Sequence, residues 1–184
     1  MSSKKPMLLV FAGPNGSGKS TIIQYFEKVG EYTNADDVVA STGMDIIEAA
    51  KFVDDKRYSA INANNDLTFE TVLSSEYKMD IIRKAKDKGY FIKCIFILTV
   101  DPLINVARVE ARVANGGHDV ARDKIISRYY KSLAHIKDLI ELCDILHVYD
   151  NSKKPVRIIR KHKNDISIFP NNIWSLSRII DLLQ

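Results

Sequence analysis

The stretch VFAGPNGSGKST at residues 10–21 restricts the fold of this chain more than any other segment. It fits the pattern G-x-x-x-x-G-K-[ST], and its fixed positions are Gly13, Gly18, Lys19 and Ser20. The apolar run at 7–12 is typical of a strand buried on both faces, and a helix is predicted at 19–28. A strand, a glycine-rich turn and a helix in this order form a cradle whose backbone N–H groups can hold a phosphate chain.

Each part of this loop has an expected task. The two fixed glycines allow the backbone to turn toward an anion, Lys19 should reach the β- and γ-phosphates, and Ser20 should ligate Mg²⁺. The implied cofactors are therefore a nucleotide, which the resemblance described below specifies as ATP, and Mg²⁺. The residues expected to bind the nucleotide are Gly13, Pro14, Asn15, Gly16, Ser17, Gly18, Lys19, Ser20 and Thr21. The loop alone does not distinguish hydrolysis, switching and phosphoryl transfer.

Strand and helix signals alternate along the rest of the chain. Further strands are predicted at 31–35, 67–69, 90–100 and 145–149, and helices at 44–64, 75–88, 102–114, 120–142 and 174–183. A hairpin is predicted at 156–161 and 166–169. This alternation predicts an α/β fold of the P-loop NTPase type, a three-layer sandwich with a mostly parallel five-stranded sheet and a C-terminal hairpin. We expect one domain over residues 1–184, with a lid at about 108–128 and the hairpin and last helix at about 153–184.

Acidic residues follow several of the predicted strands, at the sheet edge where such folds bind ligands. Asp36 could take the proton of an attacking hydroxyl or hold the water shell of magnesium, or it could belong to a turn that caps the next helix. Asp37 is the expected cap. Glu70 could position the acceptor or metal-bound water, or be held locally by Thr68 or Thr71. Asp101 precedes a proline, so a helix cap explains it without a metal.

Three arginines flank the Gly116-Gly117 pair. Arg108 and Arg112 share one helix face, and Arg128 lies on the next predicted helix. Guanidinium groups suit the charge that spreads over a transferring phosphate, and a glycine hinge suits a lid. The alternative is a solvated helix face with Glu110 and Asp123 as partners of the arginines.

The overall composition limits the other classes of function. The net charge is +4, with 27 Lys and Arg against 23 Asp and Glu, and the basic stretch 153–163 lacks interleaved aromatic residues, so nucleic acid is an unlikely partner. Cys94 and Cys143 lie in apolar runs and are expected to be buried free thiols, which fits the cytoplasm. No apolar run is long enough to span a membrane. His147 is expected to be packed, and His118 could reach phosphate.

Several stretches together resemble the zeta-toxin family of P-loop kinases, in particular its short branch. These stretches are GPNGSGKST, NADD, LTFETVLSS, RVEARVANGGHDV, ISRYYKSL and VYDNS, in the family's order and spacing. The resemblance implies ATP-dependent phosphorylation of a hydroxyl on a UDP-activated sugar such as UDP-N-acetylglucosamine. It implies Asp36 as the catalytic base and Glu70 with Thr71 as substrate-binding residues. It further implies that Lys19, Arg112, Arg108 and Arg128 stabilise the transferring group.

The resemblance has two gaps on the acceptor side. Long members carry an H-P pair after the aspartate, where this chain has DDVVAST, and an E-G-T where it has Glu70, Thr71 and Val72. Toxin members also have a small helical antitoxin as partner. The alternative function is a P-loop ATPase or nucleotide-dependent binding module in which no sugar accepts the phosphate.

Overall fold

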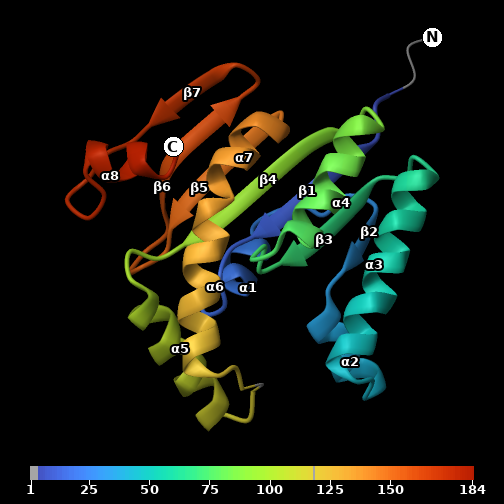
Figure 1. Cartoon of the computed structure of the whole chain (residues 1–184), viewed down its shortest axis with the longest axis horizontal. Helices are drawn as coiled ribbons and strands as arrows, with labels where there is room; N and C mark the ends of the chain where they lie inside the picture. Colours follow the sequence, from blue (N-terminus) through green and yellow to red (C-terminus); the bar gives the residue numbers. More distant parts are fainter. Residues whose placement is uncertain (1–3, 118) are drawn as a thin grey trace.

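The computed structural model describes residues 4–117 and 119–184, so the expected contact of His118 with phosphate lies outside the described residues. Its centre is a sheet with the strand order β2-β3-β1-β4-β5-β6-β7 (Figure 1). The strands are β1 Met7–Ala12, β2 Glu31–Thr33, β3 Leu67–Thr71, β4 Phe91–Leu98, β5 Ile145–Asp150, β6 Val156–His162 and β7 Asp165–Ile168. The first five in chain order pair in parallel, whereas β6 and β7 pair antiparallel.

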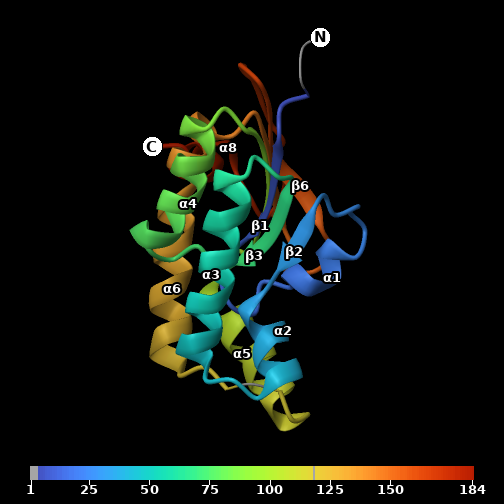
Figure 2. The ribbon, with the colours of Figure 1, turned by 90° about the vertical axis from the view of Figure 1, so that its right-hand side faces the viewer.

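Helices cover the sheet unevenly. They are α1 Lys19–Ile23, α2 Ala35–Thr42, α3 Ile46–Asn62, α4 Glu76–Asp87, α5 Pro102–Ala114, α6 Arg122–Ala134, α7 Ile136–Leu142 and α8 Leu176–Asp181. Figure 2 shows α3, α4 and α6 on one face of the sheet and α1 on the other. The helices α2 and α5 extend beyond the carboxyl ends of the strands (Figures 1 and 2). No helix in the described ranges has both the length and the apolar character needed to cross a bilayer.

The first strand is the centre of the core, as its apolar run predicts. Leu8, Val10 and Ala12 pack into the large cluster under α4 and α7, while Leu9 and Phe11 pack on the opposite face with Ile22 and Ile23. Because successive side chains of a strand point to opposite faces, an unbroken apolar run lets one strand serve two layers. The loop that follows is thereby fixed at the end of a rigid element.

The predicted fold class is confirmed, but the sheet has seven strands and not five. The hairpin forms as predicted, yet β6 pairs along β5, from His162 opposite Ile145 to Val156 opposite Asp150. Its pairing partner depends on a long-range register, which a local alternation of polar and apolar residues does not reveal.

Two helix predictions were wrong in extent, and one helix was missed. The helix expected at 19–28 ends at Ile23, and the one expected at 120–142 breaks at His135 into α6 and α7. The helix α2 was missed because none of its residues is buried, so it carries no apolar face to recognise. Its ends are set instead by Asn34, whose side chain caps it, and by Gly43, which has a left-handed backbone.

Candidate active site

The glycine loop after β1 needs its glycines for two separate reasons. Gly13 has φ 142° and Gly18 has φ 87°, values that L side chains rarely adopt. A Cβ at Gly13 would lie 1.9 Å from the carbonyl oxygen of Ile97, and one at Gly18 would lie 2.2 Å from Nδ2 of Asn151. The loop is therefore pressed against the ends of β4 and β5 and can keep this shape only with glycine.

Lys19 is folded into the loop that it follows. Its side chain is buried, and Nζ donates to the carbonyl oxygens of Gly13 at 2.8 Å and Pro14 at 3.2 Å. Burial lowers the pKa of Lys19, and the negative charges of Glu70 and Asp36 oppose that shift. The ammonium group therefore lies between the loop and two acidic residues.

Two asparagines that the sequence analysis did not single out hold the loop. Nδ2 of Asn105 on α5 donates to the carbonyl of Asn15 at 2.6 Å, and Nδ2 of Asn151 after β5 donates to the carbonyl of Ser17 at 2.9 Å. Both lie just beyond carboxyl ends of central strands, so the rule that located the acidic residues could have located them too. They bind carbonyl oxygens of the loop and so do not occupy its N–H groups, although the N–H of Ser17 already donates to the carbonyl of Pro14 at 3.2 Å.

Glu70 is the residue before the last of β3, and it lies beside polar groups of β2 and of the residue that follows β2. Its Oε2 accepts hydrogen bonds from the hydroxyl of Tyr32 at 3.1 Å and from Nδ2 of Asn34 at 3.4 Å. Burial raises the pKa of Glu70, and nearby Lys19 lowers it. Tyr32 and Asn34 were missed as site residues, although the pairing of β2 with β3 places them there.

Asp36 and Asp37 both lie in the first turn of α2. The predicted cap at Asp37 was wrong, because Asn34 caps this helix through Oδ1, which accepts from the N–H of Asp36 at 3.1 Å. The capping role is thereby already filled, and the Asp36 side chain lines the cleft described below. Thr71, expected to bind substrate, accepts from the N–H of Leu73 at 3.0 Å through Oγ1 and lines the same cleft.

A buried ion pair, also missed from sequence, joins the strands that carry this acidic side. Arg57 of α3 pairs with Asp54 at 2.8 Å and donates to the carbonyls of Thr33 at 3.1 Å and Glu70 at 3.3 Å. Lys78 of α4 pairs with the same aspartate at 2.6 Å. Because Arg57 binds a carbonyl near the carboxyl end of β2 and one near that of β3, it fixes the spacing of the side chains at these ends.

The three predicted arginines all reach the site from α5 and α6. Arg108 donates to the carbonyls of Asn151 at 2.8 Å and Ser152 at 3.1 Å, and Nη1 of Arg128 lies 3.4 Å from Oδ1 of Asn15. Arg112 lines the cleft and lowers the pKa of Lys19 by its charge. Glu110, proposed as a partner of the arginines, pairs instead with Arg122 at 3.9 Å.

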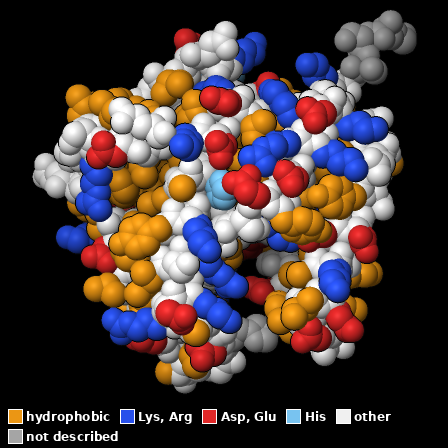
Figure 3. All heavy atoms as spheres, in the orientation of Figure 1, with side chains coloured by type: hydrophobic (Ala, Val, Ile, Leu, Met, Phe, Trp, Pro, Cys, Tyr) orange, Lys and Arg blue, Asp and Glu red, His pale blue; other side chains and the backbone are white. Residues whose placement is uncertain are grey.

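These residues enclose one cleft of ≈ 760 Å³, a size typical of small-molecule sites. Figure 3 shows the surface hollowed between the α5–α6 side and the α2–α3 side. A second hollow of ≈ 540 Å³ adjoins it and shares Ser20, Asn34, Asp37 and Glu70. The predicted residues on the wall of the larger cleft are Asn15, Gly16, Gly18, Lys19, Ser20, Thr21, Asp36, Glu70, Thr71, Arg108, Arg112 and Arg128. Gly13, Pro14 and Ser17 shape the loop but do not line the cleft.

Other singled-out residues lie away from this cleft. Asp101 is the N-cap of α5, with Oδ1 accepting from the N–H of Leu103 at 2.7 Å, which confirms the cap. Cys94 and Cys143 are buried free thiols, as expected. His147 lies half-buried on β5, and burial together with Arg157 and Lys93 lowers its pKa to about 4.

Comparisons with known proteins agree with this fold. The family model described as "Zeta toxin" matches residues 35–173. A relative from Haemophilus influenzae, described as an uncharacterized protein, is 28% identical over 127 residues, and the match covers 66% of this chain and 91% of the relative.

Two solved structures share the fold. The crystal structure of AvrRxo1-ORF1:-ORF2 with ATP has a TM-score of 0.68 at 14% identity and covers 99% of this chain, which spans 64% of that chain's length. The PezAT chromosomal toxin–antitoxin system of Streptococcus pneumoniae has a TM-score of 0.55 at 19% identity, covering 85% of this chain and 72% of that one. The family match extends over more than half of the chain. This chain therefore belongs to the zeta-toxin family of P-loop kinases.

Proposed function

We propose that this chain is an ATP-dependent small-molecule kinase that transfers the γ-phosphate to a hydroxyl of a UDP-activated sugar such as UDP-N-acetylglucosamine. The observation that carries the proposal is that Asp36 and Glu70 share one cleft with Lys19 and three arginines. A phosphate cradle faced by carboxylates can hold a donor and also orient the hydroxyl that attacks it. If only apolar or positively charged side chains lay opposite the loop, the cleft would contain no carboxylate to accept the proton of that hydroxyl.

Each residue then has a role in transfer. Lys19 and the loop bind the phosphates, Asp36 accepts the proton of the acceptor hydroxyl, and Glu70 with Thr71 binds the acceptor. Arg108, Arg112 and Arg128 stabilise the charge on the transferring group, with residues 108–128 closing as a lid. Ser20 would hold Mg²⁺, which neutralises phosphate charge when bound. The exposed Ser20 side chain lies on both hollows, and its hydroxyl is a ligand that Mg²⁺ accepts.

The adjoining hollow supports a two-substrate reaction. Its wall is built by Tyr32, Asn34 and Glu70 on one side and by residues of and after α1 on the other. Because the two hollows share Glu70, a molecule in one would lie next to a nucleotide in the other. Hydrogen-bonding groups such as the Tyr32 hydroxyl suit the hydroxyl groups of a sugar.

A second candidate is an ATPase or nucleotide-dependent binding module in which water is the attacker. The absence of the H-P and E-G-T residues favours it, since those residues lie where sugar and uridine would bind. The two functions differ in one observable quantity, the dependence of ADP release on an acceptor.

We also propose a small helical antitoxin as a partner and the cytoplasm as location. Membership of the zeta-toxin family and the fold shared with the PezAT toxin–antitoxin system support the partner. The buried free thiols support a reducing compartment.

The test is ADP release with Mg²⁺ and ATP, measured alone and with a panel of UDP-sugars. We expect at least one UDP-sugar to accelerate ADP release and Lys19→Ala to abolish the acceleration. A rate that is the same with every sugar and without any would select the ATPase.

A further inference from the structure

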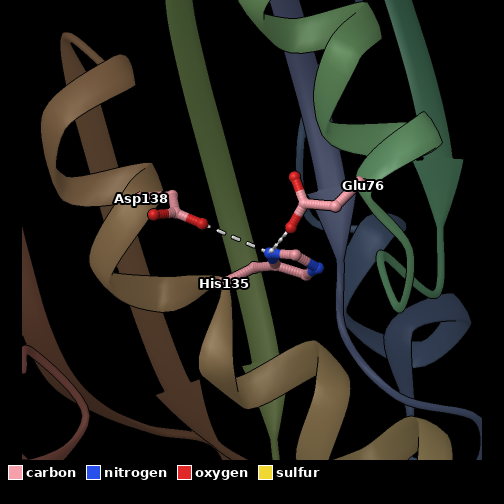
Figure 4. Close-up of side chains that lie close together, drawn as sticks. All are labelled: Glu76, His135 and Asp138. Carbon is pink, nitrogen blue, oxygen red and sulfur yellow. Dashed lines mark hydrogen bonds and ion pairs between the residues drawn. The ribbon is translucent and has the colours of Figure 1, made fainter.

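A histidine and two carboxylates lie close together on the face of the sheet that α3, α4 and α6 cover, at the junction of α4, α6 and α7 (Figure 4). Glu76 is the first residue of α4, His135 separates α6 from α7, and Asp138 lies in the first turn of α7. Their donor atoms all lie within 4.8 Å of one another. Within the described ranges, no other three His, Cys, Asp or Glu side chains come together in this way.

Both carboxylates point at the same atom of the imidazole. Nδ1 of His135 lies 3.3 Å from Oδ2 of Asp138 and 3.8 Å from Oε1 of Glu76. A neutral imidazole carries one N–H, so Nδ1 can donate to only one of these oxygens at a time. The other carboxylate then receives no hydrogen bond from Nδ1. A cation bound between the three groups would interact with both carboxylates and with the nitrogen.

The spacing fits a tetrahedral metal ion. Zinc binds histidine nitrogen and carboxylate oxygen at about 2.0–2.2 Å, which places neighbouring ligand atoms about 3.3–3.6 Å apart. The His135–Asp138 separation already falls in this range. The side chain of Glu76 is 68% exposed, so a small rotation can bring its oxygen closer.

The surroundings orient the three groups. The side chain of His135 is 10% exposed, which restricts its ring to few positions. The second oxygen of Glu76 is bound by Arg83 at 2.9 Å, which leaves Oε1 to face His135. Hydrogen bonds to the outer oxygen of a ligating carboxylate are a common way in which proteins fix such ligands.

We propose that Glu76, His135 and Asp138 form a zinc site with a fourth, open coordination position. The ion would connect the start of α4 with the junction of α6 and α7. These elements also border the cleft, because Ser74 and Ser75 precede α4 and Arg128 lies on α6. The site is separate from the expected Mg²⁺ position at Ser20, and it stands whether or not the proposed kinase function holds.

The test is a titration of the full-length protein with Zn²⁺ in excess Mg²⁺, followed by Co²⁺ absorption spectra. We expect one Zn²⁺ per chain, the intense d–d bands of tetrahedral Co²⁺, and a higher melting temperature with Zn²⁺. His135→Gln and Asp138→Asn should each weaken binding by at least the ~10- to 100-fold that loss of an outer-shell partner costs. Asp87→Asn, which changes an exposed acid at the other end of α4, should leave binding unchanged.

Unchanged affinity in both ligand variants, or weak octahedral Co²⁺ bands, would overturn the site and leave a histidine–carboxylate ion pair. Glu76→Gln provides a third variant at an exposed position, where a failure to fold is not expected. The melting temperature without metal, measured for each variant, separates loss of the ion from loss of the fold.

Discussion

The hydroxyl of Tyr32 donates a hydrogen bond to Oε2 of Glu70 at 3.1 Å, and this bond joins side chains at the ends of two neighbouring strands. It favours the ionised form of a carboxylate whose pKa is raised by burial. The bond therefore contributes, together with Lys19, to the pH at which Glu70 becomes charged.

Tyr32→Phe should raise the pH at which Glu70 becomes ionised. Without the donated hydrogen bond the pKa of Glu70 rises further, so a proton binds at higher pH and the acid limb of the kcat/KM profile shifts toward neutrality. The pH–rate profile of the variant measures the shift. Tyr25→Phe, at an exposed tyrosine that lines neither hollow, is the control. An unchanged acid limb would mean that the ionisation of Glu70 does not control the rate.

Asp36→Asn should abolish transfer while ATP still binds. Loss of a general base lowers turnover by ~10²- to 10⁴-fold, whereas the phosphates are held by the loop and Lys19. Asp37→Asn in the same helical turn is the matched control and should retain most activity. Turnover and ATP affinity, measured for both variants, check this; a reversed order would assign the base to Asp37.

Asp36 and Asp37 separate the features that the sequence predicts from those that only the structure shows. The glycine loop, β1 and the Asp101 cap depend on neighbouring residues, so local patterns were enough to predict them. The acidic residues at the strand ends followed from the parallel sheet. Choosing a cap between Asn34 and Asp37 required the actual start of α2, a helix with no buried face.

Arg57 could not have been predicted, because its role depends on contacts far along the chain. In the sequence it is one of many charged residues on a long helix, and its partners Thr33 and Glu70 lie on two different strands. Tyr32 was missed for the same reason. The position of the hairpin and the break at His135 likewise depend on tertiary packing and carry no glycine or proline signal.

Arg57→Leu should destabilise the protein by about 3 kcal/mol, because it removes one partner of a buried charge pair. We take the lower end of the usual range because Lys78 still reaches Asp54. Lys56→Met removes an exposed pair with Glu31 and should cost no more than about 1 kcal/mol. Urea unfolding of both variants measures the difference, and equal effects would contradict the clamping role of Arg57.

His147→Gln should reduce the loss of stability in mild acid. The native pKa of about 4 lies below the ordinary value of 6.5, so between these pH values the unfolded chain binds a proton that the native chain does not. Stability contributed by the neutral imidazole is present above pH 6.5 and is lost as the pH falls toward 4. The free energy of unfolding, measured at several pH values, should fall less steeply in His147→Gln than in wild type.

The destination of the γ-phosphate tests the central claim most directly. ATP labelled in the γ-phosphate is incubated with the protein, Mg²⁺ and a panel of UDP-sugars, and the labelled products are separated and identified by mass. The proposed kinase predicts label on a UDP-sugar, lost in Asp36→Asn. Label found only in inorganic phosphate, at a rate independent of every sugar, would contradict it.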